Sequence, residues 1–297
     1  MENLQNCPVC GSNDLEIYME TQDYFLTQEK FSIVECKACS FKFTNPRPLE
    51  NELAKYYKSE AYISHSDSSE GLFNKVYQKV RKYTLCKKYK LITDFKAKGK
   101  ILDIGCASGN FLSIFKENGW ETVGVEPNEE IREYAKNKFG LSVYPEDYLK
   151  QMPENEFDVI TMWHVLEHVF DLDARMRDLK RLLKKDGILI IAVPNADCLD
   201  AQIYDKYWAA YDVPRHLYHF TQKSIETLLA NYDFKIKEIK PMIFDAYYVS
   251  LLSEKYRNKK MNWIHAISNG FKSNLNSLGK NNQSSLIFVV QNSEKLK

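Results

Sequence analysis

Apolar and polar positions follow two alternating periods along the middle of the chain. Short apolar runs, typical of buried strands, are separated by segments whose apolar residues recur every three or four positions, as on one face of a helix. The pattern predicts strands at 100–104, 121–125, 141–144, 157–162 and 187–193, and helices at 110–118, 129–138 and 172–183. Strands that alternate with helices form a parallel sheet with helices on both faces. We therefore predict an α/β fold.

The pattern loosens after Pro194 and becomes regular again toward the C-terminal end. Four further elements are predicted: a helix at 224–231, a strand at 234–239, a helical insertion at about 246–276 and a strand at 285–291. The two added strands bring the sheet to seven. Residues 286–290 are all apolar, so we expect the last strand to lie inside the sheet and not at its edge.

Two further segments precede this region. Residues 1–48 contain short alternating strands that end at Asn45-Pro46-Arg47-Pro48, because proline continues neither a strand ladder nor a helix. In residues 49–98 we predict a short helix and then an amphipathic helix, where ten Lys or Arg between positions 72 and 100 accompany one Asp. Such a run is a solvated face, or it binds an anionic substrate or RNA. The predicted domains are 1–48, a helical linker or lid at 49–98, and 99–297.

Composition and charge narrow the function classes. The 297 residues are 44% hydrophobic, enough for a sizeable core. Lys and Arg total 41 against 40 Asp and Glu, for a net charge of +1, so any attraction to nucleic acid or an anionic membrane has to be local. No apolar run reaches the roughly 20 residues of a membrane span, and the N-terminus lacks the features of a signal peptide. We expect a cytoplasmic protein.

Four of the seven cysteines are paired in a C-x2-C-x25-C-x2-C pattern: Cys7, Cys10, Cys36 and Cys39. Four thiolates fill a tetrahedral zinc shell without an open position, so the pattern predicts a zinc ribbon with one structural zinc ion. The alternative, two redox C-x-x-C sites, lacks the βαβ context that such sites have. Phe41-Lys42-Phe43 and Arg47 offer only a small basic and aromatic surface, which favours a packing role over RNA binding.

A glycine turn joins the first predicted strand of the α/β region to the next helix. Such a turn directs backbone N–H groups and a helix N-terminus toward a ligand. Its spacing is Gly105-x-x-x-Gly109, which differs from the Gly-x-Gly-x-x-Gly of dinucleotide sites. Asp103 disfavours phosphate and suits cationic groups such as the sulfonium and amino nitrogen of S-adenosylmethionine. Glu126 ends the second strand, where an acid can accept hydrogen bonds from both ribose hydroxyls.

These motifs resemble those of class I S-adenosylmethionine-dependent methyltransferases, whose first motif reads Asp/Glu-x-Gly-x-x-x-Gly. The resemblance covers roughly residues 45–240. It implies a Rossmann-like, mostly parallel sheet of seven strands with the last one antiparallel. It also implies an acid near the adenine amino group, at Asp147, beside a Tyr148 that could stack. The cofactor residues expected on this basis are Asp103, Gly105, Cys106, Ala107, Gly109, Glu126, Pro127, Asp147, Tyr148 and His164.

His164-Val165-Leu166-Glu167-His168 follows the fourth of these strands. The segment spells the inverse zincin motif H-x-x-E-H, but a metalloprotease would need a long helix and a third ligand. It is also similar to the Glu-Val-Leu-Glu-His of quinone O-methyltransferases. Here His164 replaces the first Glu, which argues against a divalent metal. The alternative for Glu167 and His168 is a hydrogen-bonded helix start that shapes the pocket.

Aromatic, His and Arg residues crowd the segment Tyr211–Thr221, where the methyltransferase fold builds acceptor sites. The segment resembles the Pro-Arg-His-Leu of zinc-bearing small-molecule methyltransferases and, in part, the His-Glu-His-Leu loop of deoxysugar C-methyltransferases. Arg215 replaces the Glu of that loop, which argues against carbon methylation. We predict that His216 is the catalytic base and that Arg215 orients an anionic group. His164 is the second candidate for the base. The alternative for His216 is a loop histidine bonded to backbone.

Together these features predict an S-adenosylmethionine-dependent methyltransferase that acts on a small-molecule or glycan-type acceptor, most consistent with O-methylation. Two alternatives stay open. An rRNA base methyltransferase would use the ribbon and the basic helix, although the near-neutral charge and the lack of an Asn/Asp-Pro-Pro-Tyr/Phe motif count against it. A non-catalytic ligand-binding or scaffold protein could retain the cofactor cleft.

Overall fold

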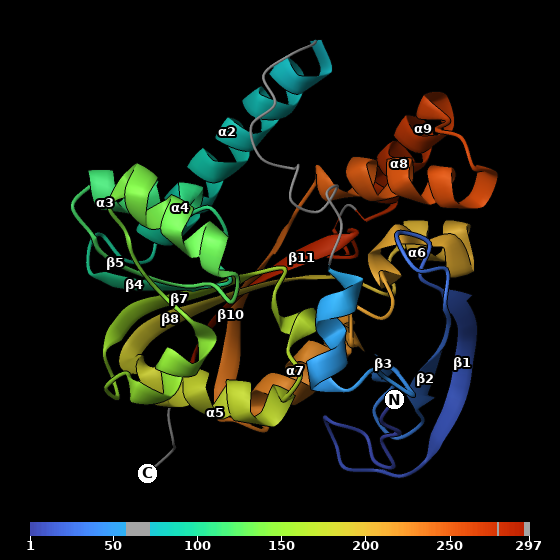
Figure 1. The fold of residues 1–297 in the computed structure, drawn as a ribbon, viewed down its shortest axis with the longest axis horizontal. Coiled ribbons are helices and arrows are strands. Elements are labelled where there is room, and N and C mark those ends of the chain that lie inside the picture. Colours follow the sequence, from blue (N-terminus) through green and yellow to red (C-terminus); the bar gives the residue numbers. More distant parts are fainter. Residues whose placement is uncertain (58–71, 278, 294–297) are drawn as a thin grey trace. The chain divides into compact units, whose positions relative to one another are not determined.

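The computed structural model describes residues 1–57, 72–277 and 279–293 (Figure 1). The chain forms two compact units. The first comprises Met1–Lys58, His164–Arg175 and Ile191–Lys297, and the second comprises Ser59–Trp163 and Met176–Ile190. The end of the short helix expected after residue 49 lies outside the described residues.

Among the described residues, seven strands form the main sheet in the order β10-β11-β8-β7-β4-β5-β6. Their bounds are β4 Lys100–Ile104, β5 Glu121–Val125, β6 Ser142–Tyr144, β7 Phe157–Trp163, β8 Leu183–Pro194, β10 Phe234–Pro241 and β11 Ser285–Asn292. β4 pairs in parallel with β5 and β7, and β5 pairs in parallel with β6, whereas β10 and β11 are antiparallel. The predicted α/β fold is confirmed, and the apolar β11 lies inside the sheet.

The helices of the α/β region also lie close to their predicted positions. Local chemistry accounts for their ends: the Asn128 side chain accepts the N–H of Ile131 at the start of α4, and the left-handed Gly140 ends that helix. Thr221 caps α7 in the same way, by accepting the N–H of Ser224. The bounds are α2 Leu72–Thr93, α3 Asn110–Glu117, α4 Glu129–Phe139, α5 Leu172–Leu182, α6 Leu199–Tyr204 and α7 Gln222–Ala230.

The N-terminal strands form a second, antiparallel sheet within the first unit. Its order is β1-β2-β3-β9, with β1 Leu15–Gln22, β2 Lys30–Cys36, β3 Lys42–Thr44 and β9 Tyr218–His219. The last strand comes from the segment rich in aromatic and His residues, where Phe43 pairs with Tyr218. Residues 1–48 therefore share a compact unit with residues 191–297, across the domain boundaries that we predicted from the sequence.

Two helices, α8 Asp245–Asn258 and α9 Trp263–Asn276, form the predicted insertion between β10 and β11 and contact each other. Short 3₁₀ helices fill several connections: η1 Glu50–Tyr56, η2 Glu146–Gln151, η3 Leu166–His168, η4 Asp205–Tyr207 and η5 Ala209–Tyr211. In the part of the chain that the structure describes, no helix has both the length and the apolarity needed to cross a bilayer.

Candidate functional site

The glycine turn of the second unit has three left-handed residues in five positions. Gly105, Ala107 and Gly109 have φ values of 74°, 45° and 77°. A side chain at Gly109 would be strained by this φ, and its Cβ would also lie 2.6 Å from a methyl carbon of Leu141. The N–H groups of Gly105 and Cys106 both donate to the carbonyl of Val125. The turn is therefore anchored to the end of β5 as it enters α3.

Glu126 is buried beside this turn. One carboxylate oxygen accepts the N–H of Ala107 at 3.1 Å, and the other accepts the N–H of Asn128 at 2.9 Å. Burial raises the pKa of Glu126. Because a carboxylate has about four acceptor positions, each oxygen keeps one for a ligand. Glu126 is thus fixed in place and can still receive two hydroxyl groups.

Asp103, at the end of β4, is also buried, and one oxygen accepts the Thr161 hydroxyl at 2.6 Å. Burial raises the pKa of Asp103 to about 7, against the opposing charge of Lys88. A bound cation would favour the ionised carboxylate. The predicted preference of this site for a cationic group therefore has a physical basis.

Two residues of the second unit near Asp103, Lys88 and Trp163, were not predicted as site residues from the sequence. The ammonium of Lys88, on α2, lies 4.0 Å from the centre of the Trp163 ring. The buried indole N–H of Trp163 has no hydrogen-bond partner among the described residues. A donor in this state is suited to a polar ligand group. Lys88 belongs to the basic run, and nothing in that pattern separates it from its solvated neighbours.

The other predicted cofactor residues differ in which of their groups a ligand could reach. The thiol of Cys106 is buried, and a Cβ at Gly124 would lie 2.7 Å from its sulfur, so Cys106 can offer only its backbone to a ligand. Tyr148 stacks on Tyr144 with ring centres 4.1 Å apart. Pro127 and Asp147 are exposed.

The four cysteines gather as predicted, in the first unit. The Sγ atoms of Cys7 and Cys39 are 3.6 Å apart, those of Cys10 and Cys36 are 3.5 Å apart, and all four lie within 4.8 Å of one another. Zn–S bonds of about 2.3 Å in a tetrahedron place sulfurs about 3.8 Å apart. These thiols are not joined in disulfides. The donor set and its spacing therefore fit one four-coordinate metal ion.

His164 follows β7 in the left-handed conformation, with φ 56°. Its Nδ1 lies 3.3 Å from Glu167 and its Nε2 lies 3.0 Å from Asp245. Although burial opposes ionisation, hydrogen bonds to Asp245 and Glu167 raise the pKa of His164 to about 10. At neutral pH both ring nitrogens are therefore donors, and His164 has no lone pair to accept a proton.

Glu167, His168 and His216 form a second group in the same unit. Glu167 is fully buried, and its Oε2 has no hydrogen-bond partner among the described residues. The Nδ1 atoms of His168 and His216 lie 3.0 and 2.8 Å from the carbonyls of Arg215 and Ala210. A carbonyl can only accept, so the Nδ1 of His216 carries the proton and its Nε2 keeps its lone pair. The Nδ1 of His168 also lies 3.0 Å from the Tyr57 hydroxyl. Burial lowers the pKa of His168 to about 4, which keeps that ring neutral.

The two imidazole rings meet edge to face, with centres 4.6 Å apart. Each of the three residues offers one ligand atom within 4.8 Å of the other two, a spacing at which the three could bind one cation. A hydrogen-bonded helix start was the alternative expected for Glu167 and His168, and both residues lie in η3. Their proximity to His216 could not be predicted, because no local sequence pattern links the two segments.

Arg215 makes a different set of contacts. It is 1% exposed, and its five N–H groups reach Asp23, Asp212 and the carbonyl of Tyr56. Although burial opposes it, the Arg215 guanidinium lowers the pKa of Asp23. No N–H group of Arg215 is left for an anionic acceptor. We therefore assign Arg215 a structural role in place of the catalytic role expected from the sequence.

Comparisons with known proteins identify the family of this chain. Residues 77–239 match a family model described as a methyltransferase domain. The chain is similar to the ubiquinone biosynthesis O-methyltransferase of Pelagibacter ubique, with 33% identity over 121 residues, which is 36% of this chain and 50% of that protein. An uncharacterized methyltransferase of Bacillus cytotoxicus is 30% identical over 115 residues, 37% of this chain and 53% of the relative. The chain thus spans about half the length of these curated relatives.

Two solved structures show the same fold. The magnesium protoporphyrin IX methyltransferase of Synechocystis, with bound SAH, aligns with a TM-score of 0.55 at 15% identity, over 82% of this chain and 100% of that chain. Phosphoethanolamine N-methyltransferase 2 of Haemonchus contortus, in complex with S-adenosyl-L-methionine, aligns with a TM-score of 0.53 at 15% identity, over 94% of this chain and 69% of that one.

Proposed function

The chain belongs to the methyltransferase domain family, and we propose that it transfers the methyl group of S-adenosylmethionine to an oxygen of a small-molecule or glycan-type acceptor. The observation that carries this proposal is the pair of buried carboxylates at the glycine turn. Asp103 suits the cationic part of the cofactor, and Glu126 has acceptor capacity for the two ribose hydroxyls. The bound cofactor supplies an electrophilic methyl carbon.

The remaining cofactor contacts follow from the same unit. The turn from Gly105 to Gly109 brings backbone close to the ligand because two of its residues lack a side chain. Tyr148, held by its stacking on Tyr144, offers a ring face for the adenine, and the exposed Asp147 can accept the adenine amino group. The unpartnered N–H of Trp163 supplies a further donor.

The proposed base is His216. Methyl transfer to a hydroxyl needs alignment of acceptor and donor and removal of one proton. The hydrogen bond from Nδ1 to Ala210 fixes the tautomer in which Nε2 accepts that proton. Glu167 adds a buried negative charge within 4.8 Å of the His216 ring that stabilises the imidazolium formed. His164 holds Glu167 in place through its Nδ1–H.

The test uses labelled S-adenosylmethionine and the full chain, with extracts divided into small-molecule, glycan and RNA pools. Label should enter the small-molecule or glycan pool. His216→Gln should lower kcat by about 10² to 10⁴ with cofactor affinity unchanged, whereas the exposed His265→Gln should have no effect. Labelled RNA would overturn the acceptor class. Transfer that survives His216→Gln and is lost in His164→Gln would identify His164 as the base in place of His216.

We also propose that Cys7, Cys10, Cys36 and Cys39 hold one structural zinc ion, in the reducing cytoplasm where thiols persist. The four free, clustered sulfurs support this assignment. Elemental analysis should find one zinc per chain, and Cys36→Ser should lose it together with the N-terminal sheet, because metal binding contributes folding energy in so small a module. Cys86→Ser removes an exposed thiol outside the four-cysteine cluster and should change neither the zinc content nor the N-terminal sheet. A soluble protein without zinc would contradict the proposal.

A further inference from the structure

The insertion formed by α8 and α9 has an unusually apolar exposed surface. Nine of the fifteen large hydrophobic side chains that are exposed among the described residues fall between positions 243 and 275. Ile264 is 80% exposed, and the others are about half exposed. They are Ile243, Phe244, Tyr248, Met261, Trp263, Ile264, Ile267, Phe271 and Leu275. Exposed apolar side chains gathered in this way mark an interaction surface.

Helix α9 is amphipathic, but its larger apolar residues point outward. Ile264, Ile267, Phe271 and Leu275 recur at helical spacing along one exposed side, which we call the α9 stripe. The buried side carries small residues instead: Ala266, Gly270 and Ser273. A Cβ at Gly270 would lie 2.9 Å from the Tyr247 ring, so this side is closely packed. Packing among the described residues therefore does not account for the stripe.

Basic residues accompany the stripe. Five fall between positions 243 and 276, against two acids: Lys255, Arg257, Lys259, Lys260 and Lys272. Both acids are engaged inside the first unit, Asp245 with His164 and Glu254 with Tyr204 and Asn258. The insertion therefore presents a net positive surface on a chain whose total charge is only +1. This is the local basic patch that the overall charge does not reveal.

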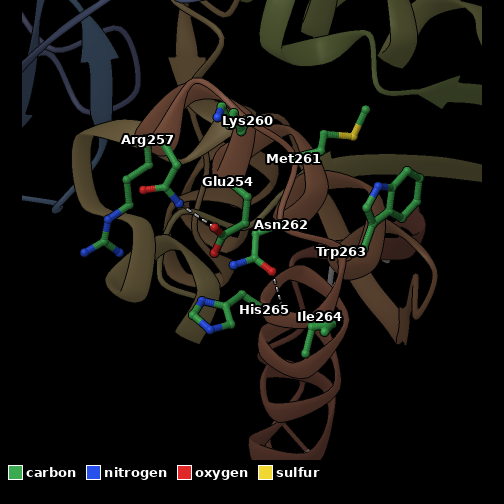
Figure 2. Close-up of a pocket in the computed structure, with 9 residues that line it drawn as sticks. Glu254, Arg257, Lys260, Met261, Asn262, Trp263, Ile264 and His265 are labelled. Carbon is green, nitrogen blue, oxygen red and sulfur yellow. Dashed lines mark hydrogen bonds between the residues drawn. The ribbon is translucent and has the colours of Figure 1, made fainter.

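A cavity of about 960 Å³ lies where α8 passes into α9 (Figure 2). Met261, Trp263 and Ile264 line one side of it, and Arg257 lines the other. The Asn262 side chain accepts the N–H of His265 and begins α9 there. Cationic groups beside an aromatic and aliphatic edge suit an anionic headgroup whose acyl chains lie next to it.

We propose that α9 lies on the surface of an anionic phospholipid membrane, with its stripe among the upper acyl chains and the basic residues at the headgroup phosphates. RNA would use the cations but gain nothing from the aliphatic stripe. A second copy of the chain would cover the stripe but bring two basic surfaces together. The proposal does not depend on the methyl-transfer reaction.

The test is co-sedimentation of the full chain with vesicles of phosphatidylcholine alone, or with about a third phosphatidylglycerol. We expect at least tenfold tighter binding to the anionic vesicles, weakened by salt. Ile264→Gln combined with Phe271→Gln should lower this affinity at least tenfold. Lys259→Gln combined with Lys260→Gln should remove most of the preference for phosphatidylglycerol. The control is Ile17→Gln, which changes an apolar residue of β1 that is 65% exposed.

These positions are exposed, so the variants should keep the fold, and binding of S-adenosylmethionine by the second unit provides a check on it. Equal binding by the α9 variant and by the wild type would overturn the proposal. The proposal would also be overturned if the wild type forms a dimer without lipid and the Ile264→Gln, Phe271→Gln variant does not, because the stripe would then bind a second copy of the chain. Absence of methyl transfer with vesicle binding intact would count against the proposed function alone.

Discussion

Two buried charges of the first unit differ in how much of their hydrogen-bonding capacity the chain itself uses. All five N–H groups of Arg215 have protein partners. Glu167 uses one oxygen for His164, and its other oxygen has no partner among the described residues. A fully paired buried charge holds elements together, whereas one with spare capacity can respond to a ligand or a proton. Burial alone would not separate these two roles.

The second unit has two more buried charges with spare hydrogen-bonding capacity, Asp103 and Glu126. Asp103 accepts one hydrogen bond and Glu126 accepts two, so both carboxylates retain acceptor positions although they are buried. Burial raises the pKa of each. Removing Arg215 should therefore act on folding, whereas changing Glu167 or Asp103 should act on catalysis or binding.

The largest effect is expected for Arg215→Met. This change leaves Asp23 buried without its cation, and breaking a buried pair in this way costs about 3–5 kcal/mol of the free energy of unfolding. Denaturant unfolding measures this loss. Lys223→Met removes an exposed cation of α7 and should stay within about 0.5 kcal/mol of the wild type. If Arg215→Met folds normally but loses turnover, the guanidinium acts on the acceptor after all.

Glu167→Gln should lower activity more than it lowers stability, in contrast to Arg215→Met. It keeps the shape of the side chain but removes the negative charge that stabilises protonated His216. We expect kcat to fall by about 10², with a smaller loss of stability than in Arg215→Met. Steady-state kinetics and denaturant unfolding on the same preparations separate the two quantities. Full activity in this variant would place Glu167 with Arg215 among the structural charges.

The strands, helices and glycine turn around the proposed cofactor site could be predicted from the sequence, because the residues that determine them are close together in the chain. The apolar run of β4, the glycine turn and the Asn128 cap each act within a few residues of chain. The cysteine spacing also identified a cluster, because sulfur pairs in tight turns have little freedom. The rest depends on long-range pairing: β9 has two residues, too few for a period, and Asp23 meets Arg215 across 192 positions. No pattern in the sequence distinguishes a paired Arg215 from an available one.

A smaller effect concerns the pH dependence of cofactor binding. The pKa of Asp103 is raised to about 7, so a cationic ligand should bind better as the carboxylate ionises. Between about pH 6 and pH 8 we expect affinity for S-adenosylmethionine to increase by about tenfold. Asp103→Asn should bind more weakly and lose this increase, and calorimetry at several pH values measures both. The ligand titrates identically in both proteins, and the exposed Glu130→Gln serves as control. An unchanged profile in Asp103→Asn would remove Asp103 from the cation site.

The smallest effect is on stability at alkaline pH, through His164. Its pKa is raised from 6.5 to about 10 in the folded chain, so the stabilisation from its contacts with Glu167 and Asp245 is complete below about pH 6.5 and is lost as the pH rises through about 10. The side chain is one-third exposed, so solvent screens the pair and the contribution should be about 1 kcal/mol or less. The measurement is the difference in unfolding free energy between the wild type and His164→Gln, which cancels groups that titrate alike in both. That difference should be largest near pH 6 and should fall almost to zero by about pH 10.5. The corresponding difference for the exposed His265→Gln should not depend on pH in this way. A difference that stays constant across this range would mean that His164 is neutral and holds Glu167 by one ordinary hydrogen bond, which would return it to the candidates for the base.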